Sequence, residues 1–117
     1  MGRFVYNIRM LRKKRSDRNH IIYKLESGKD FYIGVTAKTQ TTVNRSAQVR
    51  FNKHVYRMRS EPDKGEWKLY ASMLKKGAET FTVTILEVVR GKAPAHKRER
   101  QLIAELQPNL NSDTRGC

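Results

Sequence analysis

The chain has 117 residues, a length that suits one domain with a core that needs no disulfides. Its 25 Lys and Arg against 11 Asp and Glu give a net charge of +14, which favours a polyanion such as nucleic acid as partner. The single cysteine, Cys117, excludes intrachain disulfides and a cysteine-rich zinc finger.

Membrane binding is the weaker alternative. No apolar run approaches the roughly 20 residues that span a bilayer, and there is no obvious basic amphipathic helix. The N-terminus has basic residues but no apolar signal core, so we expect a cytoplasmic protein.

The first 19 residues are strongly basic, with seven Lys or Arg and one Asp. The cluster Arg12-Lys13-Lys14-Arg15 repels itself, so we predict a basic arm at residues 1–19 and a folded domain at residues 20–117. Such an arm is either a solvated extension or a segment that docks on phosphates. Apolar residues between Phe4 and Leu11 could instead add a short element that packs on the domain.

Two β-rich runs follow the arm, at residues 21–25 and 31–35. Ser27-Gly28-Lys29-Asp30 separates them, and this sequence is typical of a hairpin turn. Tyr23 and Tyr32 are therefore expected on paired strands. A polar loop rich in threonine follows over residues 36–42.

Apolar residues at helical spacing then predict a helix, and they are Val43, Ala47, Phe51, Val55 and Met58. Arg50 and His54 are four residues apart on a neighbouring face, where both can point toward one side of the sheet. Lys53 and Arg57 of the same helix are candidates for binding nucleic acid.

Three further elements complete the predicted fold. A break at residues 60–65 precedes a second helix, marked by Trp67, Tyr70, Ala71 and Leu74 and capped by Gly77. Threonines alternate with apolar residues in a third strand, namely Phe81, Val83 and Ile85. The last helix opens at Pro94 and closes at Pro108, and its inward residues are Leu102, Ile103 and Leu106. We therefore predict an α+β domain, a small three-stranded antiparallel sheet flanked by about three helices.

A set of residues in this chain resembles the active site of the GIY-YIG nucleases. The set is Tyr23, Tyr32-Ile33-Gly34, Arg50, His54, Glu99 and Asn111. The resemblance covers residues 20 to about 115, and it implies a GIY-YIG nuclease domain that hydrolyses DNA, similar to a small free-standing homing endonuclease. Two features depart from the family. Ile21 replaces the glycine that opens its first motif, and 15 residues separate Gly34 from Arg50.

The resemblance implies roles for the tyrosines and the arginine. Tyr23 would be the general base and Tyr32 would orient the water or phosphate. A free phenol has a pKa near 10, so we expect neighbouring positive charge to lower it. Arg50 would stabilise charge in the transition state. We prefer it to Arg45 because His54 follows Arg50 by four residues, as in the family.

The remaining residues of the set concern metal and structure. Glu99 would hold one Mg²⁺ or Mn²⁺ ion, since a single carboxylate suits Mg²⁺; the alternative is a surface glutamate paired with Arg98 or Arg100. His54 would orient a tyrosine or contact phosphate, or else be a plain helix-surface histidine. Asn111 would tie the backbone of the site together. His96, three residues before Glu99, could border the site.

Two function classes stay open. The first is a metal-dependent DNA endonuclease, with double-stranded DNA as the expected substrate. The second is a basic nucleic-acid-binding protein without catalysis, and the residue set favours the enzyme. The target, DNA or RNA preference, nicking or double-strand cleavage, and oligomeric state are left open, and a dimer on DNA is one way to cut both strands.

Overall fold

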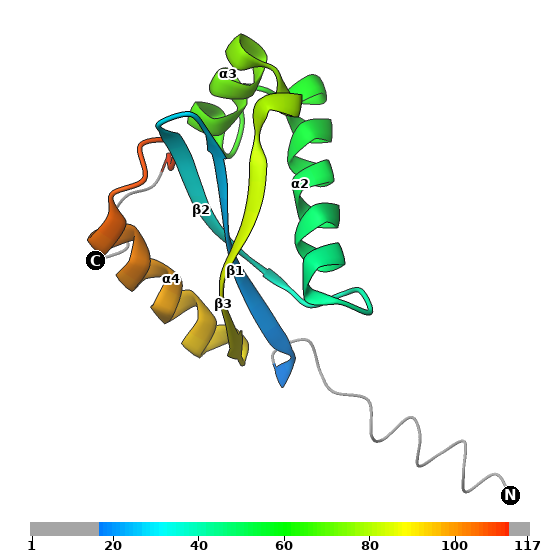
Figure 1. Cartoon of the computed structure of the whole chain (residues 1–117), viewed down its shortest axis with the longest axis vertical. Coiled ribbons are helices and arrows are strands. Elements are labelled where there is room, and N and C mark those ends of the chain that lie inside the picture. Colours follow the sequence, from blue (N-terminus) through cyan, green and yellow to red (C-terminus); the bar gives the residue numbers. More distant parts are fainter. Residues whose placement is uncertain (1–16, 113–117) are drawn as a thin grey trace, which may run out of the picture.

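The computed structural model describes residues 17–112 and centres on a three-stranded antiparallel sheet, in the order β2-β1-β3 (Figure 1). The strands are β1 (Asn19–Ser27), β2 (Asp30–Ala37) and β3 (Thr82–Arg90). The helices are α2 (Val43–Ser60), α3 (Trp67–Lys76) and α4 (Lys92–Leu106), with a short 3-10 helix, η2 (Ala78–Thr80), before β3. The predicted α+β class is confirmed. Within residues 17–112, no helix has the length and apolarity needed to cross a membrane.

The first strand of the described residues begins near the predicted boundary, which stays a prediction. Arg12, Lys13, Lys14 and Arg15 of the predicted arm lie outside the described residues. β1 begins at Asn19, and the preceding Arg18 is already tied to the fold. Its carbonyl accepts hydrogen bonds from the Gly91 N–H and from His20 Nδ1, both at 2.9 Å.

The hairpin between β1 and β2 confirms the prediction and sets the register of the sheet. Its turn contains Gly28, whose φ of +63° is the left-handed conformation that favours glycine. Tyr23 pairs with Gly34, and Leu25 pairs with Tyr32. Because side chains alternate along a strand, both tyrosines point to the same face of the sheet.

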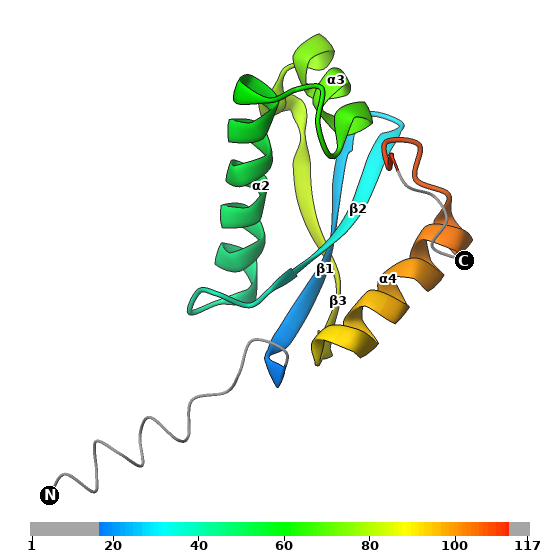
Figure 2. The same cartoon turned by 180° about the vertical axis from the view of Figure 1, so that it is seen from behind.

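Helices cover both faces of the sheet. α2 and α3 pack on one side and α4 packs on the other, as the two opposite views show (Figures 1 and 2). The core under α2 and α3 contains Ile21, Tyr23 and Leu25 of β1. The core under α4 contains Ile22 of β1 with Leu102 and Ile103 of the helix. A sheet buried on both faces explains why apolar residues run consecutively through β1.

A β-bulge interrupts the pairing of β1 with β3 beside Tyr23. Ile22 pairs with Glu87 and Tyr23 pairs with Ile85, which leaves Leu86 as the extra residue on β3. Ile85 packs in the core under α2, whereas Glu87 accepts from Arg98 of α4 and Val89 packs against the core under α4, although these residues are two and four positions further along the strand. The bulge therefore changes the face to which β3 side chains point, at the level of the candidate site.

Some apolar side chains lie differently from the prediction. Leu106 was expected to face inward but is 44% exposed, because α4 ends there and Pro108 and Leu110 are buried instead. In α3, Trp67 and Leu74 are exposed. The buried residues of α3 are Leu69, Tyr70 and Met73.

Candidate active site

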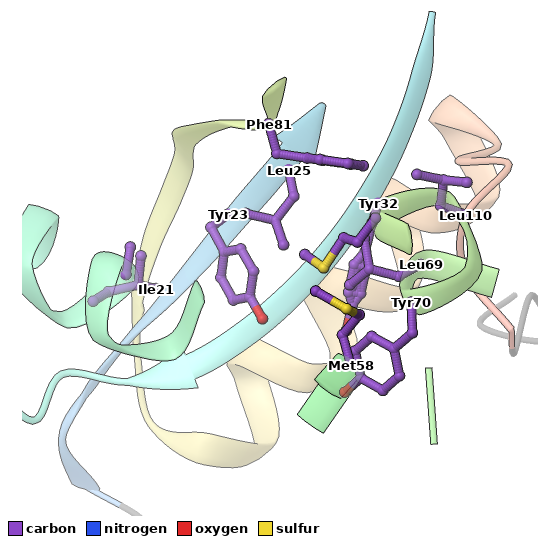
Figure 3. Close-up of a cluster of buried hydrophobic side chains, with 11 residues drawn as sticks. Ile21, Tyr23, Leu25, Tyr32, Met58, Leu69, Tyr70, Phe81 and Leu110 are labelled. Carbon is purple, nitrogen blue, oxygen red and sulfur yellow. The ribbon is translucent and has the colours of Figure 1, made fainter. Parts of the chain in front are cut away.

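Three hydrogen-bonded aromatic side chains lie buried between the sheet and the two helices on it. Tyr23 Oη lies 2.9 Å from His54 Nε2, and His54 Nδ1 lies 3.2 Å from Tyr70 Oη. Each of the three residues is at most 1% exposed. Figure 3 shows Tyr23 and Tyr70 surrounded by apolar side chains such as Leu69 and Met58. The alternative that His54 is a helix-surface histidine is therefore wrong.

Tyr32 and Gly34 complete this part of the site from β2. The rings of Tyr32 and Tyr23 meet edge to face with centroids 6.2 Å apart, and the centroid of Tyr32 lies 5.4 Å from that of His54. A Cβ atom added at Gly34 would lie 2.6 Å from Tyr23 Oη and 3.0 Å from Tyr32 Oη. The two hydroxyls thus converge over Gly34, and only glycine leaves room for them.

Arg50 reaches the same place from α2. Its guanidinium is a hydrogen-bonding and electrostatic neighbour of Tyr23, whereas Arg45 is exposed in the first turn of the helix. The 15 residues between Gly34 and Arg50 are not one long loop, because they include the end of β2 and the first turns of α2. The helix begins at Thr42, whose side chain accepts a hydrogen bond from the backbone N–H of Arg45.

The pKa of Tyr23 is set by opposing effects. Burial raises it to about 12, although the charge and hydrogen bond of Arg50 and the hydrogen bond of Tyr32 lower it. Glu99 adds a smaller electrostatic increase. The expected lowering by positive charge is therefore present but outweighed, and the net shift is opposite to the one predicted. Desolvation disfavours a buried phenolate more than one arginine stabilises it.

His54 is neutral in this environment. Burial, followed by the positive charges of Arg50 and Arg57, lowers its pKa to about 3. A neutral imidazole has one N–H donor and one acceptor nitrogen. Because Arg50 and Tyr32 act on the Tyr23 oxygen as hydrogen-bonding neighbours, we assign the Tyr23 O–H as donor to His54 Nε2. His54 Nδ1–H then donates to Tyr70 Oη.

Lys53 and Arg57 were predicted to bind nucleic acid, and both lie on α2 near the site. Arg57 forms a hydrogen bond that lowers the pKa of Tyr70, although burial raises it overall. It also acts electrostatically on His54. Lys53 is exposed and lines a surface groove together with Arg50 and Arg57. Arg57 is therefore a second arginine at the mouth of the site.

Glu99 lies on α4 and acts on both tyrosines through its charge. Its side chain is 18% exposed, and burial raises its pKa to about 7, with a further increase from Glu66. His96 Nδ1 lies 3.7 Å from Glu99 Oε1, so the predicted neighbour does border the site. The alternative pairing with Arg98 does not occur, because Arg98 Nε donates to Glu87 at 2.9 Å.

Glu66 is a second carboxylate that the sequence reasoning did not identify. It precedes the first residue of α3 and raises the pKa of Glu99, Tyr32 and Tyr70 through its charge. Sequence periodicity does not mark Glu66, because a residue at the start of a helix belongs neither to the apolar stripe nor to a motif. Only the assembled fold brings its charge into range of these groups.

The carboxylates near the site suit a divalent ion whose remaining ligands would come from the substrate and water. Within residues 17–112, no group of three or more His, Cys, Asp or Glu side chains could enclose a metal. Mg²⁺ is often bound by one or two carboxylates together with phosphate oxygens and water. A partly buried Glu99 next to the negative charge of Glu66 fits that arrangement, and it does not fit an all-protein cage.

Asn111 fastens β2 to the segment after α4. Its side-chain Oδ1 accepts from the Ile33 N–H at 2.9 Å, and its Nδ2 donates to the Ile33 carbonyl at 2.8 Å. Asn109 Oδ1 accepts from the Phe31 N–H at 3.0 Å, and the Leu110 N–H donates to the Phe31 carbonyl at 3.0 Å. The segment therefore pairs with the free edge of β2, and Asn111 has the backbone-tying role that the resemblance implied.

Replacing Gly34 by alanine should destabilise the fold. The new Cβ would lie 2.6 Å from Tyr23 Oη and 2.7 Å from its Cζ, and the fully buried ring has no room to retreat. Overpacking of this kind costs about 1–3 kcal/mol, measurable by urea denaturation. Thr36→Ala is the control, because it removes atoms at the next position on the same face of β2. Equal urea midpoints for Gly34→Ala and the parent would contradict the packing described above.

The environment of Glu99 predicts a pH-dependent stability. Its pKa is raised from 4.5 to about 7, so its favourable contribution is complete below pH 4.5 and is lost as pH rises through 7. His54 has the opposite dependence, but it is common to both proteins and cancels in the comparison. Between pH 5 and 8 without metal, Glu99→Gln should gain about 1–3 kcal/mol over the parent in urea unfolding. A difference that does not change with pH would show that Glu99 is solvated.

Comparison with protein-family models, curated proteins and solved structures gave no match to this chain. A GIY-YIG relationship therefore depends on the residue set and stays a prediction. The geometry of Tyr23, His54, Arg50 and Glu99 is independent of that resemblance.

Proposed function

We propose that this protein is a metal-dependent DNA endonuclease of the GIY-YIG type, which hydrolyses phosphodiester bonds. The observation that supports this most is the convergence of two tyrosine hydroxyls over Gly34, with Arg50 and Glu99 both acting on Tyr23. These four groups come from four different elements, namely β1, β2, α2 and α4. A merely structural core has no need to bring an arginine and a carboxylate to a buried phenol.

Arg50 and Arg57 are the residues that would hold the phosphate. Hydrolysis builds negative charge on the phosphate oxygens, and a guanidinium fork offers donors that match them. Arg50 lies next to Tyr23, and both arginines depress the pKa of His54 by their charge. Their combined positive potential at one point suits a phosphodiester anion.

Tyr23 and His54 would accept the proton that the attacking water loses. As water attacks phosphorus, its proton passes to the Tyr23 oxygen while the Tyr23 proton passes to His54 Nε2, 2.9 Å away. The new oxygen–phosphorus bond replaces the bond to the departing alcohol oxygen, which takes up a proton from solvent, and His54 then releases its proton to solvent. The pKa of about 3 opposes charging of His54 in the free protein. A bound phosphate would offset the charges of Arg50 and Arg57 and so raise that pKa.

Glu99 would hold the metal ion beside this machinery. Bound Mg²⁺ or Mn²⁺ supplies positive charge that stabilises the phosphate oxygens and the departing oxygen. The Glu99 carboxyl must be ionised for this role, and its raised pKa of about 7 disfavours ionisation without a cation. Cation binding and Glu99 ionisation are therefore coupled, so metal affinity should increase with pH.

A nucleic acid is the substrate class that the charge supports, and DNA is the one that the resemblance implies. The net charge of +14 favours a nucleic acid, and the exposed Lys53 and Arg57 extend the positive surface beyond the site. The second candidate, a binding protein without catalysis, would need the charge but not the Tyr23–His54 hydrogen bond or the partly buried Glu99.

Removing the charge of Glu99 tests the nuclease. Supercoiled plasmid incubated with the parent and Mg²⁺ should be nicked or linearised, and chelator should stop the reaction. Glu99→Gln keeps the shape of the side chain, so its rate should fall by at least about 10² while DNA binding persists. Glu105→Gln, on an exposed position of the same helix, should cleave like the parent. A parent that binds plasmid but never cuts it would instead favour the non-catalytic binding protein.

Removing the hydroxyl of Tyr23 tests the proton path. Tyr23→Phe leaves His54 without its partner at 2.9 Å, and the cleavage rate should fall by about 10²–10⁴. If His54 receives the proton, the parent's rate should rise with pH and level off near neutrality, once its imidazole is neutral in the complex. A rate that keeps rising above pH 8 would mean that Tyr23 must ionise first. Circular dichroism should show that the variant remains folded.

A further inference from the structure

A groove runs along the outer side of α2 and opens at the candidate site. Its volume is about 530 Å³, and its lining includes Arg50, Lys53, Tyr56 and Arg57. Arg50 acts on Tyr23 and Arg57 acts on Tyr70, so one end of the groove is formed by side chains of the site itself. Glu61 also lines the groove, but its carboxylate lies 3.8 Å from Lys64 Nζ, which offsets its charge.

Tyr56 has no structural reason to lie in this groove. It is 72% exposed, more than any other large apolar side chain in residues 17–112. The buried side of α2 is the opposite one, where Ala47, His54 and Met58 face the sheet. A tyrosine ring held in solvent between Lys53 and Arg57 contributes little to the core.

Cations and an exposed aromatic ring in one groove match single-stranded nucleic acid. Positive side chains follow the phosphates while a base stacks on the ring, an arrangement that is tolerant of sequence. A base inside a continuous duplex is already stacked on both faces and cannot use the ring. Tyr56 lies six residues from Arg50, about 9 Å along the helix axis. That spans at most two to three nucleotides, if the strand keeps the rise of roughly 3.4 Å per nucleotide that it has in a stacked duplex.

We propose that this groove binds an unpaired DNA strand, with one base stacked on Tyr56 and phosphates on Lys53 and Arg57. For cleavage, which depends on the function proposed above, the substrate is then DNA with unpaired nucleotides next to the cut bond, as in a flap or a bubble. The expected substrate is therefore double-stranded DNA that also carries such a single-stranded segment.

The test is binding without divalent ions, so that it does not depend on catalysis. Fluorescence anisotropy in chelator compares a single strand, a blunt duplex and a flap duplex labelled with fluorescein. Tyr56→Ala should weaken binding of the single strand and the flap by about tenfold or more, because a base on an aromatic ring contributes about 1–3 kcal/mol. Tyr56→Phe should bind like the parent and Tyr56→Leu should resemble Tyr56→Ala. Leu74→Ala changes another exposed apolar residue, on α3, and should have no effect.

A 2-aminopurine base placed two or three nucleotides from the flap junction should lose fluorescence on binding to the parent, but not to Tyr56→Ala. The proposal would be overturned if Tyr56→Ala bound each of the three DNAs as tightly as the parent does. It would also be overturned if the parent bound RNA of the same sequence more tightly than DNA and this binding depended on Tyr56. A protein that binds the flap through Tyr56 yet cuts neither the flap nor plasmid when Mg²⁺ is added would support the groove and remove the nuclease. Plasmid cleavage by the parent, together with no effect of Tyr56→Ala on binding, would support the nuclease and remove the proposed groove.

Discussion

The contact between the Tyr23 hydroxyl, Gly34 and His54 is the constraint on which the site depends. The β1–β2 register must set Tyr23 opposite Gly34, because any side chain there would occupy the space of the hydroxyl. α2 must then approach closely enough for His54 Nε2 to lie 2.9 Å away. Once both conditions hold, Arg50, one helical turn before His54, reaches the same phenol. Strand register and helix position are thus fixed by the same polar contact.

The site draws its charges from helices on both sides of the sheet. Arg50 and Arg57 come from α2, whereas Glu99 comes from α4 and Glu66 from the start of α3. Burial and the charges of Arg50 and Arg57 keep His54 uncharged, whereas burial and the charge of Glu66 raise the pKa of Glu99. A phosphate near the arginines and a cation near the glutamates would relieve both penalties at once. This mutual relief is the physical basis for the proposed substrate and metal.

The segment after α4 covers the free edge of β2 and so links the elements that carry the site residues. An open edge strand presents unpaired N–H and C=O groups that invite association. Here the side chain of Asn111 takes the place of a peptide group and pairs with both polar atoms of Ile33. Because this segment directly follows α4, the helix that carries Glu99 is held against the strand that carries Tyr32. Movement of α4 relative to β2 would therefore break hydrogen bonds as well as apolar contacts.

Local pattern determined the secondary structure and the α+β class, since strand alternation, the turn at Gly28 and the helical stripe from Val43 to Met58 are properties of neighbouring residues. The resemblance to the GIY-YIG nucleases, and not this pattern, selected Tyr23, Tyr32, Arg50, His54, Glu99 and Asn111. Neither could reveal Glu66, the exposure of Leu106 or the raised pKa of Tyr23. These depend on which elements pack together and on how much water they exclude. Burial and through-space charge belong to the assembled fold, so only the tertiary structure decided whether the phenol would be charged.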